Sequence, residues 1–140
     1  MLDIRSGLRA FLLADAAVAA VVSTRIFPTR MPQGEKGTSI VYLRISGLGD
    51  HTLAGASRIS RPRFQIDCWA QSPGAAADLA NLVKERLDGY RGEMPYGTAS
   101  PQLSIECLGV FFENERDGFD ADNEMFVVSR DYFVWHREMS

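Results

Sequence analysis

A strand followed directly by a helix, within residues 61–90, constrains the fold of this chain more than any other stretch. In residues 62–70 apolar and polar side chains alternate, which is typical of a strand with one buried face. Ser72 can then act as the N-cap of a helix, and the proline after it loses no helical hydrogen bond at the first position. This helix is predicted to run through Asp88 and to stop at Gly89, where a left-handed residue is favoured.

The predicted helix has one apolar face, whose members recur at steps of three and four residues: Ala76, Leu79, Ala80, Val83 and Leu87. The preceding strand has one apolar face as well, formed by Phe64, Ile66 and Cys68. We therefore expect the helix to pack on this face of the strand and the rest of the chain to be arranged around the pair.

The remaining segments add two helices and several strands. The last two strands are joined by a connection too short for a parallel crossover, so they are expected to form an antiparallel hairpin. The predicted fold is α+β, a single domain over residues 1–140 with a mainly antiparallel sheet of about five strands and helices on one face. The further predicted elements are helices over 4–14 and 16–22, strands over 24–28, 39–46, 102–112 and 125–136, an irregular linker over 90–101 and an acidic hairpin loop over 113–124.

Composition argues against several classes of function. The chain has 140 residues and a formal charge of −3, which does not favour a protein built to grip nucleic acid. No apolar run approaches the roughly 18 residues of a membrane span, and no basic leader precedes a cleavable core, so we expect folding in a cytoplasm. Cys68 and Cys107 lie in predicted strands and are expected to be buried, reduced thiols.

Candidate catalytic and metal-binding groups are few, so we predict no enzyme, no cofactor and no metal. His51 and His136 have no partner at a useful spacing, and His136 is expected at an edge or on the surface. The acidic loop over 113–124 resembles a calcium loop only in its carboxylates and lacks the EF-hand spacing. We expect a solvated hairpin tip that folds without metal. The strand carboxylates are expected to pair with arginines: Asp67, Glu106 and Asp131.

Large apolar side chains in predicted loops are the other notable group. Tyr90, Met94 and Tyr96 lie in the predicted linker, and Phe119 lies in the acidic loop. Such side chains either pack back onto the core or contact a partner, and the sequence leaves both interpretations open. They favour an interaction protein over an enzyme.

Seven short segments form a succession that spans nearly the whole chain. They are residues 4–10, 13–20, 25–28, 50–53, 61–70, 87–92 and 132–136, which read IRSGLRA, LADAAVAA, RIFP, DHTL, RPRFQIDCWA, LDGYRG and YFVWH. This succession resembles the tail terminator (tail completion) proteins of siphophages and gene transfer agents. None of the segments is a catalytic motif, so the specificity comes from their order.

The resemblance implies a virion protein that is assembled in the host bacterial cytoplasm and forms a ring, usually a hexamer, at the head-proximal end of the tail tube. There it ends tube growth and meets the head–tail connector or stopper, while DNA passes through the lumen without specific binding. It implies no enzymatic activity and no cofactor. Two alternatives stay open: another head–tail connector or stopper protein, or a small cytoplasmic enzyme with an unrecognised site.

Residues 47–60 are predicted to form the far part of a long β-ribbon that grows from the strands at 39–46 and 61–70. In a ring, such a ribbon would reach a neighbouring subunit or the tube. The alternative is a flexible surface loop. The predicted subunit or partner interface comprises Leu48, His51, Leu53, Ile59, Tyr90, Met94 and Tyr96.

Overall fold

The computed structural model describes residues 4–46, 49–52, 55–97 and 103–137, and for 49–52 and 55–57 it describes the backbone alone. Among the described residues, no helix has the length and apolar character needed to cross a membrane. The elements are α1 (Ile4–Leu13), α2 (Ala16–Val22), β1 (Ile26–Pro28), β2 (Ser39–Ser46), β3 (Gly49–Thr52), β4 (Gly55–Ser60), β5 (Arg63–Ala70), α3 (Pro73–Leu87), β6 (Gly92–Tyr96), β7 (Leu103–Asp120) and β8 (Met125–Arg137).

The strand–helix unit predicted at residues 61–90 is present as β5 and α3. Burial alternates residue by residue along β5, and all five members of the α3 stripe are buried. The Ser72 side chain accepts a hydrogen bond from the backbone N–H of Ala75 at 3.1 Å, as expected of an N-cap. Gly89 follows the helix with a φ of +80°, a conformation that suits glycine. Local sequence therefore determines both ends of α3.

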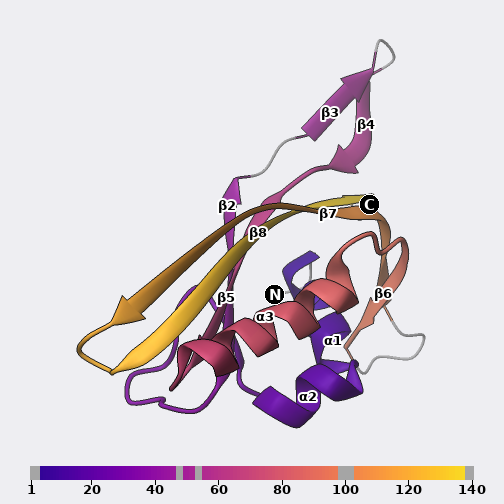
Figure 1. Ribbon diagram of the computed structural model, residues 1–140. Coiled ribbons are helices and arrows are strands. Elements are labelled where there is room, and N and C mark those ends of the chain that lie inside the picture. The colour runs from indigo at the N-terminus through magenta and orange to yellow at the C-terminus, as the bar shows by residue number, and fades with distance from the viewer. Residues whose placement is uncertain (1–3, 47–48, 53–54, 98–102, 138–140) are drawn as a thin grey trace.

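The long strand β8 lies at the centre of the sheet. It pairs antiparallel with β5 on one side and with β7 on the other, and β2 continues the sheet beyond β5. The α+β class is as predicted, with helices on one face (Figure 1). However, the described sheet has eight strands instead of about five, and it is mixed, because β1 pairs in parallel with β2.

The helices bury one face of this sheet in a continuous apolar core. Tyr132 and Phe64, the largest fully buried side chains, lie opposite each other on β8 and β5. Helix α1 approaches β6 and β7 closely at Gly7, where an added Cβ would lie 3.3 Å from Ile105 Cδ1 and 3.5 Å from Met94 Cβ. Glycine inside a helix costs about 1 kcal/mol of stability relative to alanine. The packing of α1 on the sheet at Gly7 offsets this cost.

The prediction of an irregular linker over residues 90–101 is wrong for its central part. Residues Gly92–Tyr96 form β6, which pairs antiparallel with the start of β7. Pro95 is tolerated because β6 is an edge strand of the described sheet. Met94 and Tyr96, for which the sequence leaves both core packing and partner contact open, are buried, with exposed fractions of 0% and 2%.

The predicted acidic loop over 113–124 is also mostly strand, because β7 continues to Asp120 and only residues 121–124 form the turn. Charged residues are tolerated there because the neighbouring strand supplies partners. For example, the guanidinium of Arg130 lies 2.6 Å from the carboxylate of Glu115, its cross-strand neighbour. The predicted antiparallel hairpin is thus present, with a tip much shorter than expected.

His136 is buried, contrary to the expected edge or surface position, with an exposed fraction of 8%. The reason is its place in β8, where β4 pairs on one side and β7 on the other. Cys68 and Cys107 are buried free thiols, as predicted.

Candidate interaction surfaces

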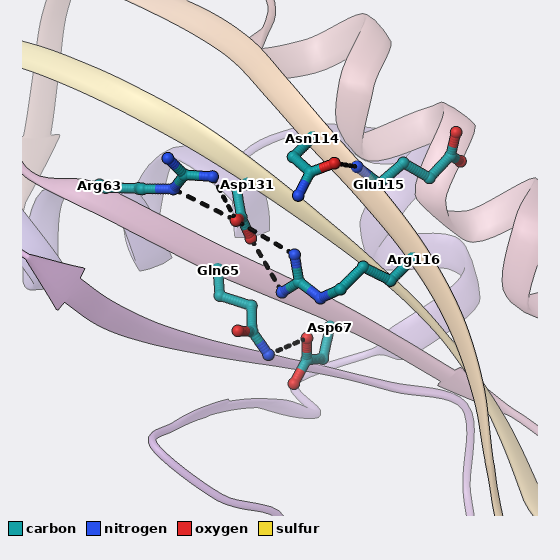
Figure 2. A network of polar contacts seen from close by, with 7 residues as sticks. All are labelled: Arg63, Gln65, Asp67, Asn114, Glu115, Arg116 and Asp131. Carbon is teal, nitrogen blue, oxygen red and sulfur yellow. Dashed lines mark hydrogen bonds and ion pairs between the residues drawn. The ribbon is translucent and has the colours of Figure 1, made fainter.

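The sheet face opposite the helices carries an ion-pair network that joins three strands (Figure 2). Asp131 of β8 accepts hydrogen bonds from Arg63 of β5, at 2.9 and 3.2 Å, and from Arg116 of β7, at 3.1 and 3.2 Å. Beside it on the same face, the Gln65 side chain donates to the carboxylate of Asp67 at 2.8 Å. These contacts cross-link β5, β8 and β7.

Electrostatics show that the network is structural. Burial alone raises the pKa of Asp131, but the hydrogen bonds from Arg116 and Arg63 outweigh burial, and the pKa is lowered overall. The hydrogen bond to Asp131 likewise raises the pKa of Arg116. Asp131 is therefore ionised at neutral pH and is unsuited to exchange protons with a substrate. Glu106 is paired too, with Arg137 at 2.9 Å, so the predicted arginine pairing holds for Glu106 and Asp131.

Next to this network, aromatic side chains line a shallow depression of about 400 Å³, which we call the aromatic hollow. The Phe111 ring meets the Trp135 ring edge to face, with centroids 6.2 Å apart. The guanidinium carbon of Arg61 lies 5.1 Å from the centre of the Trp135 ring. The guanidinium carbon of Arg63 lies 5.5 Å from the centre of the Phe133 ring. The hollow is lined by Arg61, Phe111, Glu113, Phe133 and Trp135.

A glycine shapes this hollow. Gly109 lies opposite Trp135 across the β7–β8 ladder, and a Cβ there would come within 2.9 Å of the Phe111 ring. The ring therefore folds over the glycine backbone and reaches toward Trp135 instead of pointing straight into solvent. Even so, Phe111 is 51% exposed, although phenylalanine is among the residue types most often buried.

The predicted ribbon is present as the antiparallel pair β3–β4. It extends away from the helices and the rest of the sheet (Figure 1). Only Ile59 and Ser60 of β4 pair with β8, so the remainder of the described ribbon is two-stranded. Two-stranded ribbons are marginal in isolation, so the described ribbon has little support from its own subunit beyond β4.

The residues predicted for the interface fall into three groups. Leu48 and Leu53 lie outside the described residues, and for His51 only its backbone position in β3 is described. Ile59 is half-buried at the base of the ribbon. Tyr90, Met94 and Tyr96 do not lie on the ribbon and are not brought together with it.

The last three residues belong to the packing of the subunit. Met94 and Tyr96 are part of its core. The half-buried Tyr90 packs its ring against Phe11 in a tilted arrangement, with ring centroids 4.2 Å apart, and its hydroxyl donates a hydrogen bond to the Glu93 carbonyl at 2.7 Å. Of the two interpretations left open by the sequence, packing onto the core accounts for these side chains.

The β7–β8 turn closes on itself through its own side chains. The carboxylate of Asp120 accepts from the Asp122 backbone N–H at 3.0 Å and from the Asn123 amide at 2.9 Å. In the part of the chain that the structure describes, no group of three or more potential metal ligands comes together. Phe119 beside the turn packs against Phe126, with ring centroids 4.7 Å apart, yet remains 55% exposed.

Neither cysteine is placed as a nucleophile. Burial, assisted by the charge of Asp67, raises the pKa of Cys68 far above its usual range despite the nearby Arg130. Burial also raises the pKa of Cys107. Both thiols therefore stay protonated at neutral pH, as expected of packing residues.

The aromatic hollow is the feature that sequence reasoning missed. A signal for part of it was present, because alternation along β8 puts Phe133 and Trp135 on the face opposite the buried Tyr132 and Val134. Nothing in the sequence indicated that Phe111 and Arg61 would join them, since this depends on the pairing of β7 with β8 and on the chain between β4 and β5.

Comparison with known proteins identifies relatives of both the sequence and the fold. The family model described as Tail completion protein gp17 matches residues 6–137. A chain in the structure of the virion of a native gene transfer agent (GTA) particle has the same fold, with a TM-score of 0.75. The two chains share 16% sequence identity, and the match covers 96% of this chain and 95% of that one. No curated protein matches the sequence.

Proposed function

Because the chain belongs to the family of tail completion proteins typified by gp17, we propose that it forms a closed ring, expected to be a hexamer, at the head-proximal end of the tail tube. In this position it ends tube growth and joins the tube to the head–tail connector. DNA passes through the lumen without being bound in a sequence-specific way.

Family membership makes this protein a structural component of a phage-type tail, located in the virion, and not an enzyme. The polar groups of the structure agree with a purely structural role. Asp131 is held ionised by two arginines, and both thiols are buried and protonated. These groups stabilise a fold and offer no reactive centre.

The observation that carries the proposal of a ring is the β3–β4 ribbon. A ribbon held to its subunit by two ladder positions gains stability when it lies against a second molecule. In a ring, each ribbon meets either the next subunit or the tube, and all copies make the same contact. The ribbon thus supplies a means of assembly that a protein acting as a monomer does not need.

Growth of the tail tube in vitro tests the proposal. Tail tube protein from the same particle is polymerised with and without this protein, and tube lengths and ends are measured by electron microscopy. We expect shorter tubes and a ring-shaped density at one end only. Tubes of unchanged length with bare ends would overturn the proposal. A density that binds finished tubes but leaves their growth unchanged would favour a connector or stopper instead.

A further inference from the structure

We propose that the β7–β8 turn of one subunit docks into the aromatic hollow of the next, with Phe119 as the inserted side chain. This inference rests on the proposed ring and names the contact that builds it. It concerns two surfaces that are separate from the ribbon.

The two most exposed large apolar side chains among the described residues are Phe119 and Phe111, at 55% and 51%. The remaining three, Ile45, Val21 and Leu103, are 47% or less exposed. Exposing a phenylalanine ring to water has a free-energy cost, and burial at an interface removes it. One buried ring contributes roughly 150–250 Å² of contact surface. Both phenylalanines lie on β7, so one strand presents both surfaces.

The surroundings of the two rings differ in shape. Phe111 lies inside the hollow beside Trp135 and Phe133, whereas Phe119 stands beside a tight turn. An aromatic depression is a receptor for an apolar side chain, and an exposed ring beside a turn is an insert for such a depression. One chain therefore carries both halves of a contact.

The charges around the two rings are complementary. Phe119 is surrounded in sequence by carboxylates at the end of β7 and in the turn: Asp117, Asp120, Asp122 and Glu124. Lys36 is the cation whose charge acts on Asp120. Arg61 lies over the Trp135 ring of the hollow and Arg63 over the Phe133 ring, and Glu113 is the carboxylate among the lining residues. An acidic turn that enters the hollow brings its carboxylates toward these two guanidinium groups, which favours a second copy of this chain as the occupant.

The positions of the two rings favour a ring-shaped assembly. Phe111 pairs with Phe133 on the open face of the sheet, whereas Phe119 pairs with Phe126, which packs against the core on the helix side. Eight residues of strand separate them, or roughly 26 Å. A contact between different surfaces on opposite faces and ends of a subunit is head-to-tail, and repeating it produces a closed ring when the rotation closes.

Two variants with matched changes test this contact, F111D in the hollow and F119D at the turn. Both side chains are exposed, so each variant should melt within a few degrees of the unchanged protein. Each variant alone is expected to remain monomeric under conditions in which the unchanged protein forms rings, as measured by native mass spectrometry. L103D, which changes another exposed apolar residue of β7, serves as the control and should form rings normally.

A mixture of the two variants gives the most specific result. F119D retains an intact hollow and F111D retains an intact turn, so exactly one productive contact can form between them. The mixture is expected to give a heterodimer and no larger species. A face-to-face contact between identical surfaces would not give this pattern.

Three results would overturn the inference. If both variants form rings like the unchanged protein, this contact has no part in assembly, although the proposed ring itself is supported. If F111D forms rings but no longer binds tail tube protein, the occupant of the hollow is the tube. If the unchanged protein forms no ring with or without tube protein, the proposed function and this inference fail together.

Discussion

Arg63 and Asp131 lie 68 positions apart in the sequence, yet the guanidinium Nη2 of one is 2.9 Å from the carboxylate Oδ2 of the other. Arg116 binds the same carboxylate through both of its terminal nitrogens. The side chain of Asp131 is only 3% exposed, whereas those of Arg63 and Arg116 are 32% and 42% exposed. One buried carboxylate thus joins three strands, and it does so beside the aromatic hollow.

The first prediction concerns this carboxylate. D131N is expected to lower the free energy of unfolding at pH 7 by about 1–2 kcal/mol, because the two arginines can turn toward solvent and recover part of the loss. The pKa of Asp131 in the folded state lies below its ordinary value of 3.8. The stabilisation by its ionised carboxylate is therefore complete above pH 3.8 and is lost as the pH falls through the lowered folded-state pKa.

Urea unfolding of both proteins between pH 7 and pH 2.5 measures this effect. The difference between the unchanged protein and D131N should shrink below about pH 4. E106Q serves as the control, because Glu106 and Arg137 are 47% and 50% exposed and such surface pairs contribute little. A pH-independent difference for D131N would contradict the assigned role of its charge.

The second prediction concerns thiol reactivity. Burial raises the pKa of Cys68 and of Cys107, so the reactive thiolate is scarce in the folded protein. Iodoacetamide at pH 8 is expected to leave both residues unmodified while the protein is folded and to modify both in guanidinium chloride. Rapid modification of either cysteine in the folded protein, read by mass spectrometry, would show that it is accessible.

The third prediction concerns the contact of α1 with the sheet. In G7L, a leucine side chain must enter the space now filled by Ile105 and Met94, whose atoms are 3.3 and 3.5 Å from the site of an added Cβ. We expect a loss of about 2–3 kcal/mol in the free energy of unfolding. G7A should lie within about 1 kcal/mol of the unchanged protein, since the helix preference of alanine offsets the tight contact. If G7L is as stable as G7A, α1 does not pack as described.

The fourth prediction concerns the ribbon. Replacing residues 50–58 by two glycines removes most of β3 and β4 and keeps the strands that enclose the core. The melting temperature of the subunit is expected to change by only a few degrees, because β4 pairs with β8 at just two positions. Ring formation should be lost or greatly weakened, as seen in the mass of the assembly. Normal rings from this variant would show that the ribbon has no part in assembly.

The sequence predicted those elements that local chemistry specifies. α3 has a serine N-cap, a proline at its start, a glycine after its end and an unbroken apolar stripe, and β5 alternates along its whole length. For such segments the preference of each residue agrees with the final structure. The ribbon, described as β3 and β4, is predicted on a different ground, the adjacency of its two flanking strands in the chain.

The parts that were predicted wrongly depend on pairing with a neighbouring strand and not on the preferences of their own residues. β6 contains a proline, begins at Gly92 and is followed by Gly97, and it is a strand because it pairs with the start of β7. The acidic half of β7 has low strand propensity and is ordered by its pairing with β8. The aromatic hollow and the Asp131 network join β7, β8 and the β4–β5 region, so the sequence indicates only parts of them: the shared face of Phe133 and Trp135, and an arginine partner for Asp131.

The mass of the assembled particle tests the central claim most directly. Native mass spectrometry of the purified protein, alone and with tail tube protein, should show one discrete species at about six times the 15.5 kDa subunit mass, with no continuous ladder of larger species. A ladder would indicate an open filament rather than a closed ring. A species of 15.5 kDa alone, at every concentration and with tube protein present, would contradict the account.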